Sequence, residues 1–304
     1  MEKFSSGLPP WFSSFMAINA DRSRVIKEVL DKKGIKNTLL ELEGAMFVLA
    51  WPKNTEMDEY YRVKIISAHH DRVPGSPGAL DNSAACLQLV NFLEKEAASF
   101  NTMAVFTDRE ELGYFSPMEQ GSFLLSKAIE SYGFRDTASF PLDVTGCGDS
   151  LVISLAPMHF SENQNAILQK PGSEAITEAG KAAIKKIAEE SMDLADSLVR
   201  MMAGRAPVYC LSLPFGEDLG YILAGMPSVL ASVLPRPEAD ALAAGSSLPA
   251  WASLEQPGCR SPATWQILHS REDSPEHFTA SAFDLMDKYL TRLACLKLPA
   301  RIKG

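Results

Sequence analysis

The chain has 304 residues, of which 46% are hydrophobic and 22% charged, and its 29 basic against 38 acidic residues give a net charge of −9. This composition excludes disordered, collagenous and low-complexity proteins, and the length provides enough apolar residues for a large core. Nucleic acids and anionic membranes attract clustered Lys and Arg, so the acidic balance argues against both as partners. No shift in composition marks a boundary, and we therefore expect one domain over residues 1–304.

The N-terminus and the cysteines bear on the cellular compartment. Pro9, Pro10 and several serines interrupt the first thirty residues, so no apolar stretch there reaches signal-peptide length. No segment approaches the roughly 18–20 apolar residues of a membrane helix. The cysteines are far apart without a CxxC pair, which argues against disulfides and a thiolate zinc site. We expect a soluble, reduced, cytoplasmic protein and interpret each cysteine as a small buried hydrophobe. The five are Cys86, Cys147, Cys210, Cys259 and Cys295.

The first half of the chain alternates between helical and strand patterns. Asp21 is a good N-cap, and apolar residues at helical spacing follow it until Gly34. The apolar run at 103–107 is typical of a strand in a sheet that is covered on both faces. In chain order we expect a helix between Asp21 and Gly34, strands at 37–51 (with a turn near Gly44) and 61–68, a Pro- and Gly-rich loop at 71–82, a helix at 83–98 and a strand at 103–107.

The second half continues the alternation and adds one irregular segment. We expect helices at 121–131, 173–202 and 275–293, strands at 138–144, 151–155, 208–213 and 228–234, and a long loop excursion at 235–262, which is rich in Pro, Ala, Ser and Gly. Strands that alternate with helices imply an α/β fold. Its central sheet is expected to be mostly parallel and twisted, with helices on both faces.

Three of the strand patterns end in acidic residues or histidine. His69 and Asp71 follow the first, Glu110 and Glu111 the second, and Asp143 the third. Open α/β sheets bind ligands beyond the carboxyl ends of their strands, and carboxylates gathered there need a compensating cation. Histidine with carboxylates suits zinc or a similar metal, and two metals about 3.5–4 Å apart are most simply held by a bridging carboxylate. Each motif alone is more often a solvated surface cluster, but their shared position favours a common site.

The spacing within these motifs suggests separate roles. Residues i and i+2 of an extended segment lie on one side, so Asp71 can orient the ring of His69 while His70 points away. The adjacent Glu110 and Glu111 must diverge. One can therefore bind a metal while the other accepts a proton from the attacking water, which is the division of labour that metal-assisted hydrolysis requires.

In its ordered series of motifs the sequence resembles the di-zinc exopeptidases, in particular bacterial leucyl aminopeptidases and aminopeptidase Y-like enzymes. The series spans residues 68 to 273, and the PGAxDN and EExG pieces are its most specific parts. The resemblance implies a zinc-exopeptidase fold of the phosphorylase/hydrolase-like type. The matching pieces are AHHD (68–71), SPGALDN (76–82), DREELG (108–113) with GS at 121–122, PLDVTG (141–146), GMPSV (225–229) and LHSRED (268–273).

The resemblance also implies a complete set of metal ligands. Asp81 matches the carboxylate that bridges two divalent ions, for which Zn²⁺ is the expected metal. His69 and Asp143 match the other ligands of one ion. Glu111 and His269 match those of the second.

The same resemblance assigns the remaining chemistry. Glu110 matches the general base, and Asp71 matches the residue that orients His69. The peptide bond after the bridging aspartate is commonly cis in this group, so a cis Asp81–Asn82 bond is expected. The implied activity is aminopeptidase hydrolysis of a peptide or aminoacyl substrate.

Several features leave alternatives open. A carboxypeptidase would need an arginine in the pocket to bind the substrate carboxylate. A glutaminyl cyclase with one metal and a metal-binding protein without catalysis are further alternatives. The acidic motif of the group is present as Glu217 and Asp218 without the usual following histidine, and Tyr209 is either a group that polarises the substrate carbonyl or a buried sheet tyrosine. The arginines near the motifs are Arg72, Arg109, Arg236, Arg260 and Arg271.

Overall fold

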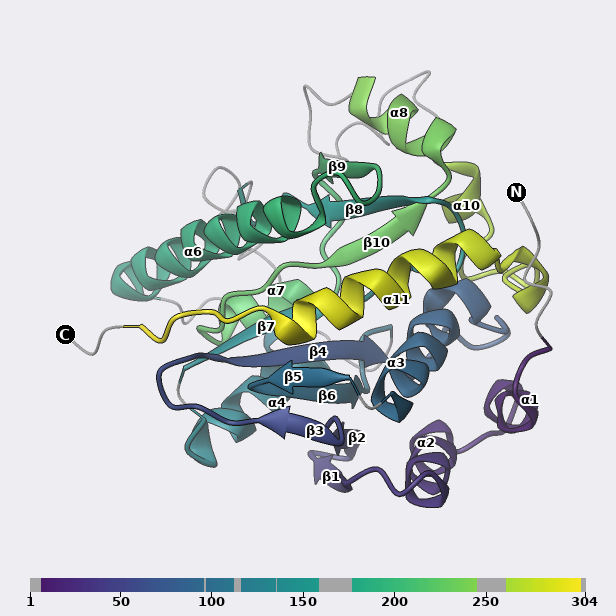
Figure 1. The fold of residues 1–304 in the computed structure, drawn as a ribbon, viewed down its shortest axis with the longest axis horizontal. Helices are drawn as coiled ribbons and strands as arrows, with labels where there is room; N and C mark the ends of the chain where they lie inside the picture. Colours follow the sequence, from purple (N-terminus) through teal and green to yellow (C-terminus); the bar gives the residue numbers. More distant parts are fainter. Residues whose placement is uncertain are drawn as a thin grey trace.

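A five-stranded sheet with the strand order β1-β2-β6-β4-β7 lies at the centre of the computed structural model (Figure 1). The structure describes residues 7–95, 97–111, 116–134, 136–158, 177–244 and 261–301. Strands β6, β4 and β7 are parallel, and β1 and β2 extend one edge as antiparallel neighbours. The strands are β1 (Asn37–Leu42), β2 (Ala45–Ala50), β4 (Val63–His69), β6 (Thr102–Thr107) and β7 (Thr137–Pro141).

Two smaller sheets accompany the central one. In the first, β8 (Ser150–Ser154) pairs with antiparallel β10 (Ala231–Leu234) and parallel β9 (Val208–Leu211). Two isolated parallel bridges, Ser139 to Ser228 and Leu142 to Ala231, connect it to the β7 side of the central sheet. The second pairs β3 (Asn54–Glu56) with β5 (Ala98–Phe100) in parallel. The expected α/β fold with a mostly parallel central sheet is confirmed.

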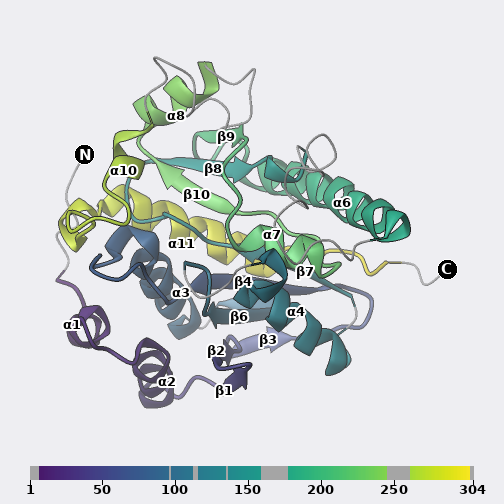
Figure 2. The same ribbon diagram turned by 180° about the vertical axis from the view of Figure 1, so that it is seen from behind.

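Helices cover both faces of the sheet because the side chains of its buried strands alternate between two cores. In β4, Ile66 and Ala68 pack with α3 and α11, whereas Ile65 packs with α4 and α7. Figure 1 shows α11 and α3 in front of the sheet, and Figure 2 shows α4 and α7 on the opposite side. The helices are α1 (Pro10–Met16), α2 (Arg22–Lys32), α3 (Ala84–Glu94), α4 (Gly121–Ser131), α6 (Glu178–Met202), α7 (Glu217–Leu223), α8 (Arg236–Ala244), α10 (Ala263–Gln266) and α11 (Ala280–Cys295).

Most long elements lie where the sequence predicts them. Asp21 caps α2 by accepting a hydrogen bond from the backbone N–H of Arg24 at 3.1 Å, and α4 has the expected bounds. The long helix α6 begins at Glu178, and the first residues of its predicted range lie outside the described part of the chain. The helix predicted at 83–98 ends at Glu94, because the chain turns there and enters β5.

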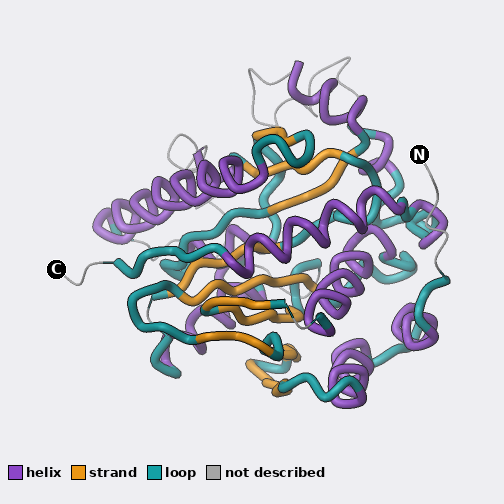
Figure 3. Tube along the Cα trace, in the orientation of Figure 1, coloured by secondary structure: helices purple, strands orange, loops and turns teal. Residues whose placement is uncertain are grey.

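The segment 235–262 was expected to be a loop, and its described part contains α8. Pro237 is tolerated in the first turn of a helix, and the alanines that follow are strong helix formers. The Asp149 carboxylate accepts the backbone N–H of Arg236 at 2.8 Å, which satisfies one free donor at the start of the helix. Residues 245–260 lie outside the described part. Figure 3 shows helices and strands of very different length, and the sequence did not predict several of the short ones: α1, α7, α10, β3 and β5.

The described cysteines are all free thiols, as expected, but not all of them are buried. Cys86 lies in the core, whereas Cys210 on the edge strand β9 and Cys295 at the end of α11 are exposed. The interpretation of each cysteine as a buried hydrophobe is therefore wrong for these two, because edge strands and helix ends face solvent. Cys259 lies outside the described residues. Among the helices that the structure describes, none is both long and apolar enough to cross a membrane.

Gly121 provides a test of the packing between α4 and the loop after β6. A Cβ atom at this position would lie 1.7 Å from the carbonyl oxygen of Asp108. We expect Gly121→Ala to lower the free energy of unfolding by about 1–3 kcal/mol because the loop must shift. Urea unfolding measures this loss. Gly7→Ala is the control, since nothing lies within 4 Å of its Cβ. Equal stability of the two variants would contradict the packing described.

Candidate metal centre

The carboxyl ends of three adjacent parallel strands form the base of the site. His69 is the last residue of β4, and Asp143 follows the end of β7 by two positions. Glu110 and Glu111 follow β6, which ends at Thr107. Because β6, β4 and β7 are neighbours in the sheet, their ends lie at one edge. The prediction that these strand ends meet is confirmed.

Two further loops complete the site. Asp81 lies in a kinked turn, Ala79–Ser83, directly before α3, and its own backbone is not helical (φ −118°, ψ 86°). His269 follows α10, and its backbone has a φ of 60°, in the left-handed region that few non-glycine residues adopt. The Asp81–Asn82 peptide bond is cis, as the family resemblance implied.

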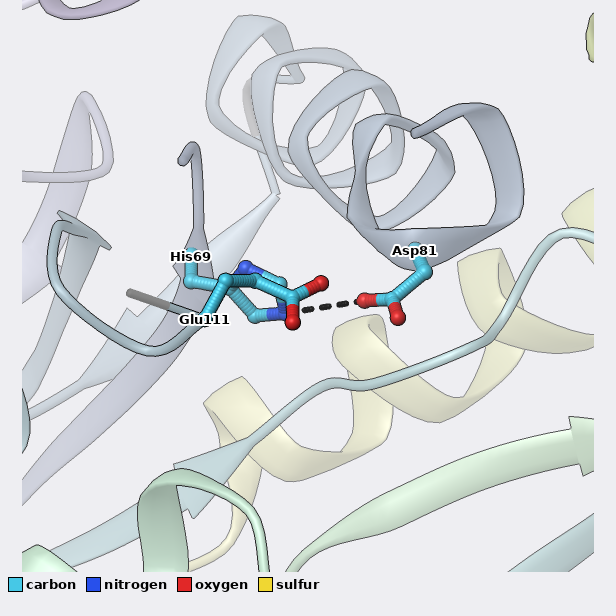
Figure 4. A group of neighbouring side chains, drawn as sticks. All are labelled: His69, Asp81 and Glu111. Carbon is cyan, nitrogen blue, oxygen red and sulfur yellow. Dashed lines mark ion pairs between the residues drawn. The ribbon is translucent and has the colours of Figure 1, made fainter. Parts of the chain in front are cut away.

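Asp81 lies between the two histidines. Its Oδ1 is 3.2 Å from Nε2 of His69, and its Oδ2 is 3.0 Å from Nε2 of His269. Figure 4 shows the side chains of His69, Asp81 and Glu111 pointing toward one another. The two oxygens of one carboxylate therefore face two separate groups of side chains.

A second carboxylate accompanies each histidine. Asp143 Oδ1 lies 3.6 Å from Nε2 of His69, and Glu111 Oε2 lies 3.2 Å from Nε2 of His269. The His69 side chain is 1% exposed, whereas that of His269 is 55% exposed, so the site opens to solvent on the His269 side. The structure thus brings together all five residues that the sequence suggested as ligands, in two groups that share Asp81.

These distances fit divalent metal binding. Zinc ligands lie about 2.0–2.2 Å from the ion, which places tetrahedral ligand atoms roughly 3.3–3.6 Å apart. Ligand atoms of His69, Asp81 and Glu111 all lie within 4.8 Å of one another. Both ring nitrogens of His69, Oε1 of Glu111 and Oδ1 of Asp143 are buried and have no hydrogen-bond partner among the described residues. Such atoms are costly to bury unless something binds them.

The electrostatics of the protein alone also call for a cation. Burial raises the pKa of Glu110 well above its ordinary value, and neighbouring carboxylates raise it further. Burial, with the charge of Asp81, raises the pKa of Glu111 to about 8. Burial alone would lower the pKa of His69, but its three carboxylate neighbours hold this pKa well above the usual value. Without a metal, protons on the histidines balance the acids, and a divalent ion would replace those protons.

Asp71 connects two of the candidate ligands. Its Oδ1 lies 3.4 Å from Nδ1 of His69, and its Oδ2 accepts the backbone N–H of Glu111 at 3.0 Å. The ring of His70 points away from the site, as predicted, and its Nε2 lies 2.8 Å from the carbonyl oxygen of Met46. Asp71 is therefore placed to orient both the His69 ring and the loop after β6.

A cavity of about 400 Å³ adjoins these side chains. Its polar wall contains Asp81, Glu110, Glu111, Asp143 and His269. Much of the remaining lining is apolar and comes from later segments of the chain: Leu213, Phe215, Leu230, Trp265 and Leu268. The cavity thus places an apolar binding surface beside a set of convergent charged groups.

Comparison of the sequence with known families identifies the family of this chain, because residues 47–292 match the profile of Peptidase family M28. The chain belongs to this family. Members of Peptidase family M28 are generally metallohydrolases that bind zinc. No curated protein sequence matches this M28 family member.

Solved structures share the fold of this M28 family member at low sequence identity. The LapA aminopeptidase of Legionella pneumophila has a TM-score of 0.57 and 10% identity, over 94% of this chain and 71% of that one. LapB from the same organism has a TM-score of 0.54 and 10% identity, over 93% and 70%. The glutaminyl cyclase of Porphyromonas gingivalis has a TM-score of 0.55 and 12% identity, over 93% and 95%.

Tyr209 and Glu217, which the sequence suggested as functional residues, do not line the cavity of this M28 family member. The hydroxyl of Tyr209 donates to Asp240 of α8. Glu217 is buried behind the site, where it accepts a hydrogen bond from Ser67 of β4 at 3.1 Å. Burial raises the pKa of the Glu217 carboxyl to about 7. Neither side chain is placed to touch a substrate in the cavity.

The structure adds one residue whose role the sequence did not predict. Asp273 is fully buried, and its carboxylate accepts the backbone N–H of Leu80 at 2.6 Å and that of Asp81 at 3.3 Å. It therefore connects the loop that carries His269 to the turn that carries Asp81. The acidic pattern of LHSRED gave no sign of this contact, because it joins residues about 190 positions apart.

Replacement of Asp273 in the metal-free form of this M28 family member tests this contact. Asp273→Ala leaves two buried N–H groups without their acceptor, so the free energy of unfolding should fall by about 1–3 kcal/mol. Urea unfolding in the presence of a chelator measures the loss. Glu272→Ala removes an adjacent exposed acid and should change stability little. If both variants unfold at the same midpoint, the contact has no energetic role.

Proposed function

We propose that this protein is a zinc aminopeptidase that hydrolyses N-terminal peptide bonds with two metal ions. The observation that carries the proposal is the position of the Asp81 carboxylate, whose two oxygens face two separate histidine–carboxylate groups. A bridging carboxylate is what a two-metal hydrolase requires. His69 and Asp143 would hold one ion, and Glu111 and His269 the other.

Glu110 is the residue that we assign to proton transfer. Zinc, when bound, supplies Lewis acidity and lowers the pKa of a bound water to about 7. Glu110 lines the cavity beside Asp143, and a Cβ at Gly216 would lie 3.5 Å from Glu110 Oε1 and 3.2 Å from Asp143 Oδ2. The glycine therefore leaves space in front of both carboxylates. In this space Glu110 can accept a proton from the attacking water and pass it to the leaving amine.

The charge of the cavity favours an N-terminal over a C-terminal substrate. Among its described lining residues, four carboxylates and His269 carry the ionisable groups, and neither Arg nor Lys is present. Arg72 and Arg109 donate instead to backbone carbonyls elsewhere, and Arg236 pairs with Asp240. Arg260 lies outside the described residues. A cavity rich in carboxylates and without a basic side chain suits a substrate α-ammonium group, whereas a carboxypeptidase would need a cation.

The apolar wall supports a preference for substrates with an apolar first residue. Leu213, Leu230 and Trp265 line the same cavity as the charged side chains. A charged substrate side chain placed there would lose its hydration without a partner.

The other functions considered from the sequence are less well supported. A cyclase with one metal would not need both histidine–carboxylate groups, and the likeness to glutaminyl cyclase concerns the fold alone. A silent metal-binding protein would need a blocked pocket, and the segment 235–262 is the candidate for blocking it. Among the described residues of 235–262, no residue of α8 lines the cavity, and Ser261 is the one that does.

A substrate panel tests the proposed activity. With two equivalents of zinc, we expect leucyl-p-nitroanilide to be cleaved with a kcat/KM roughly 10- to 100-fold above the aspartyl and lysyl compounds, because the wall is apolar. N-acetyl-leucyl-p-nitroanilide should not be cleaved, since it lacks the α-ammonium group. Cleavage of an N-blocked peptide at its C-terminus would support a carboxypeptidase. Formation of pyroglutamate from glutaminyl peptides would support a cyclase. Either result would contradict the proposal.

Glu110→Gln tests the assigned base. The amide cannot accept the proton, so kcat should fall by about 10²–10⁴-fold. Zinc content, measured by elemental analysis after dialysis, should stay at two ions per chain, because Glu110 is not a proposed ligand. Glu59→Gln, an exposed substitution, is the control. An active Glu110→Gln enzyme, or one that has lost zinc, would show that the assigned role is wrong.

A further inference from the structure

The N-terminal segment precedes the part of the chain that matches the family profile, which begins at residue 47. This segment forms α1, α2, β1 and the start of β2. Figures 1 and 2 both show α1 and α2 below α3, the helix that follows the Asp81 turn. Two arginines, Arg22 of α2 and Arg72 of the loop after β4, connect the segment to the metal centre.

Arg22 is the first residue of α2, and only 6% of it is exposed. Its guanidinium lies over the Phe15 ring, 4.5 Å from the ring centroid, and its Nε donates to the Phe15 carbonyl. One terminal nitrogen donates to the carbonyl of His70 at 2.9 Å. The other donates to the carbonyl of Pro77 at 3.0 Å and to Oγ of Ser83 at 3.1 Å. A single side chain thus contacts three separate points on the ligand-bearing loops.

The positions of these three acceptors give the contacts their meaning. His70 directly follows His69 in the chain. Pro77 and Ser83 lie on either side of Asp81, and Ser83 also donates to the carbonyl of Gly78 within the same turn. The guanidinium therefore holds the end of β4 and both sides of the Asp81 turn at a fixed separation. These are the two segments whose ligand atoms, on His69 and Asp81, are 3.2 Å apart.

Arg72 strengthens the same connection from the opposite direction. It donates to the carbonyls of Ala17 at 2.7 Å and Ile18 at 2.9 Å, in the connection between α1 and α2. It also donates to the carbonyls of Met16 at 3.2 Å and Pro77 at 2.9 Å. The N-terminal segment and the loop before Asp81 are therefore joined by donors from both sides.

The partners of Arg22 indicate a geometric role. Among the described residues, no carboxylate forms an ion pair with it within 4.0 Å, and its charge is satisfied by neutral oxygens. Burying a cation is costly unless its donors are bonded, so this arrangement persists only while the acceptors stay in place. A lysine cannot reproduce it, because one ammonium group lacks the planar fork of donors.

We propose that Arg22 is a positioning residue that holds the Asp81 turn against the end of β4, which makes the segment before residue 47 part of the metal centre. The inference rests on the proposed two-zinc site. Replacement of Arg22 should weaken zinc binding at the site formed by His69, Asp81 and Asp143, because the separation of His69 and Asp81 is no longer fixed.

Zinc affinity of full-length variants tests this role. In competition with a chromophoric chelator, Arg22→Lys and Arg22→Gln should bind one of the two zinc ions about 10- to 100-fold less tightly than the parent chain. At saturating zinc, kcat should fall while KM changes less than about threefold, since the cavity wall is untouched. Ile26, also buried in α2, contributes to the core. Either Ile26→Val or Ile26→Ala, whichever matches the unfolding midpoint of the Arg22 variant, is the control and should keep full zinc affinity.

The outcomes separate the two proposals. A parent chain that binds no zinc or cleaves no substrate would overturn the proposed function, and with it this inference. A parent chain with two zinc ions, together with Arg22 variants of unchanged affinity, would overturn only the role of Arg22. Equal losses in the Arg22 and Ile26 variants would do the same, since they would show a general effect of stability. If Arg22→Gln does not fold, Arg22→Lys decides by the same criteria.

Discussion

Repulsion between buried carboxylates is the constraint on which this structure depends. Asp81, Glu110, Glu111 and Asp143 come together at the ends of the sheet, where burial and their mutual charge raise the pKa of three of them. The protein gains nothing in stability from such an arrangement by itself. The arrangement is maintained by packing and hydrogen bonding around the site, and the clustered negative charges favour a nearby cation. The candidate metal centre is therefore a property of the surrounding scaffold as much as of the candidate ligands.

That scaffold acts at the level of the backbone. Parallel strands β6, β4 and β7 fix three of the ligand-bearing segments, because strand register leaves little freedom at the strand ends. The Asp81 turn has no such ladder. It is held instead by side chains from distant parts of the chain, with Asp273 bound to its N–H groups and Arg22 to its flanking oxygens. Hydrogen bonds with charged side chains thus fix the position of this turn, as hydrogen bonds to neighbouring strands fix the position of the strand ends.

Most features that depend on residues close together in the chain could be predicted from the sequence, whereas side-chain contacts between distant residues could not. Strands and helices with clear periodicity, such as β4 and α4, could be predicted because local pattern and burial agree. The meeting of His69, Glu110 and Asp143 followed from the rule that parallel strands share an edge. The resemblance to a family supplied His269, which no local pattern singles out. α8 was missed because its Pro and Ala content suits both a loop and a helix. The contacts of Arg22 and Asp273 join residues up to about 190 positions apart, so no sequence window contains both partners.

The order of the ligands along the chain has a consequence for biosynthesis. His69 and His269 are 269 − 69 = 200 positions apart, yet both face the same carboxylate. A ribosome adding about 5–20 residues per second takes roughly 10–40 seconds to travel between them. During that interval the nascent polypeptide exposes Asp81 without its second histidine. The complete set of candidate ligands therefore exists only after translation has passed His269, so the two histidine–carboxylate groups cannot assemble on a shorter nascent chain.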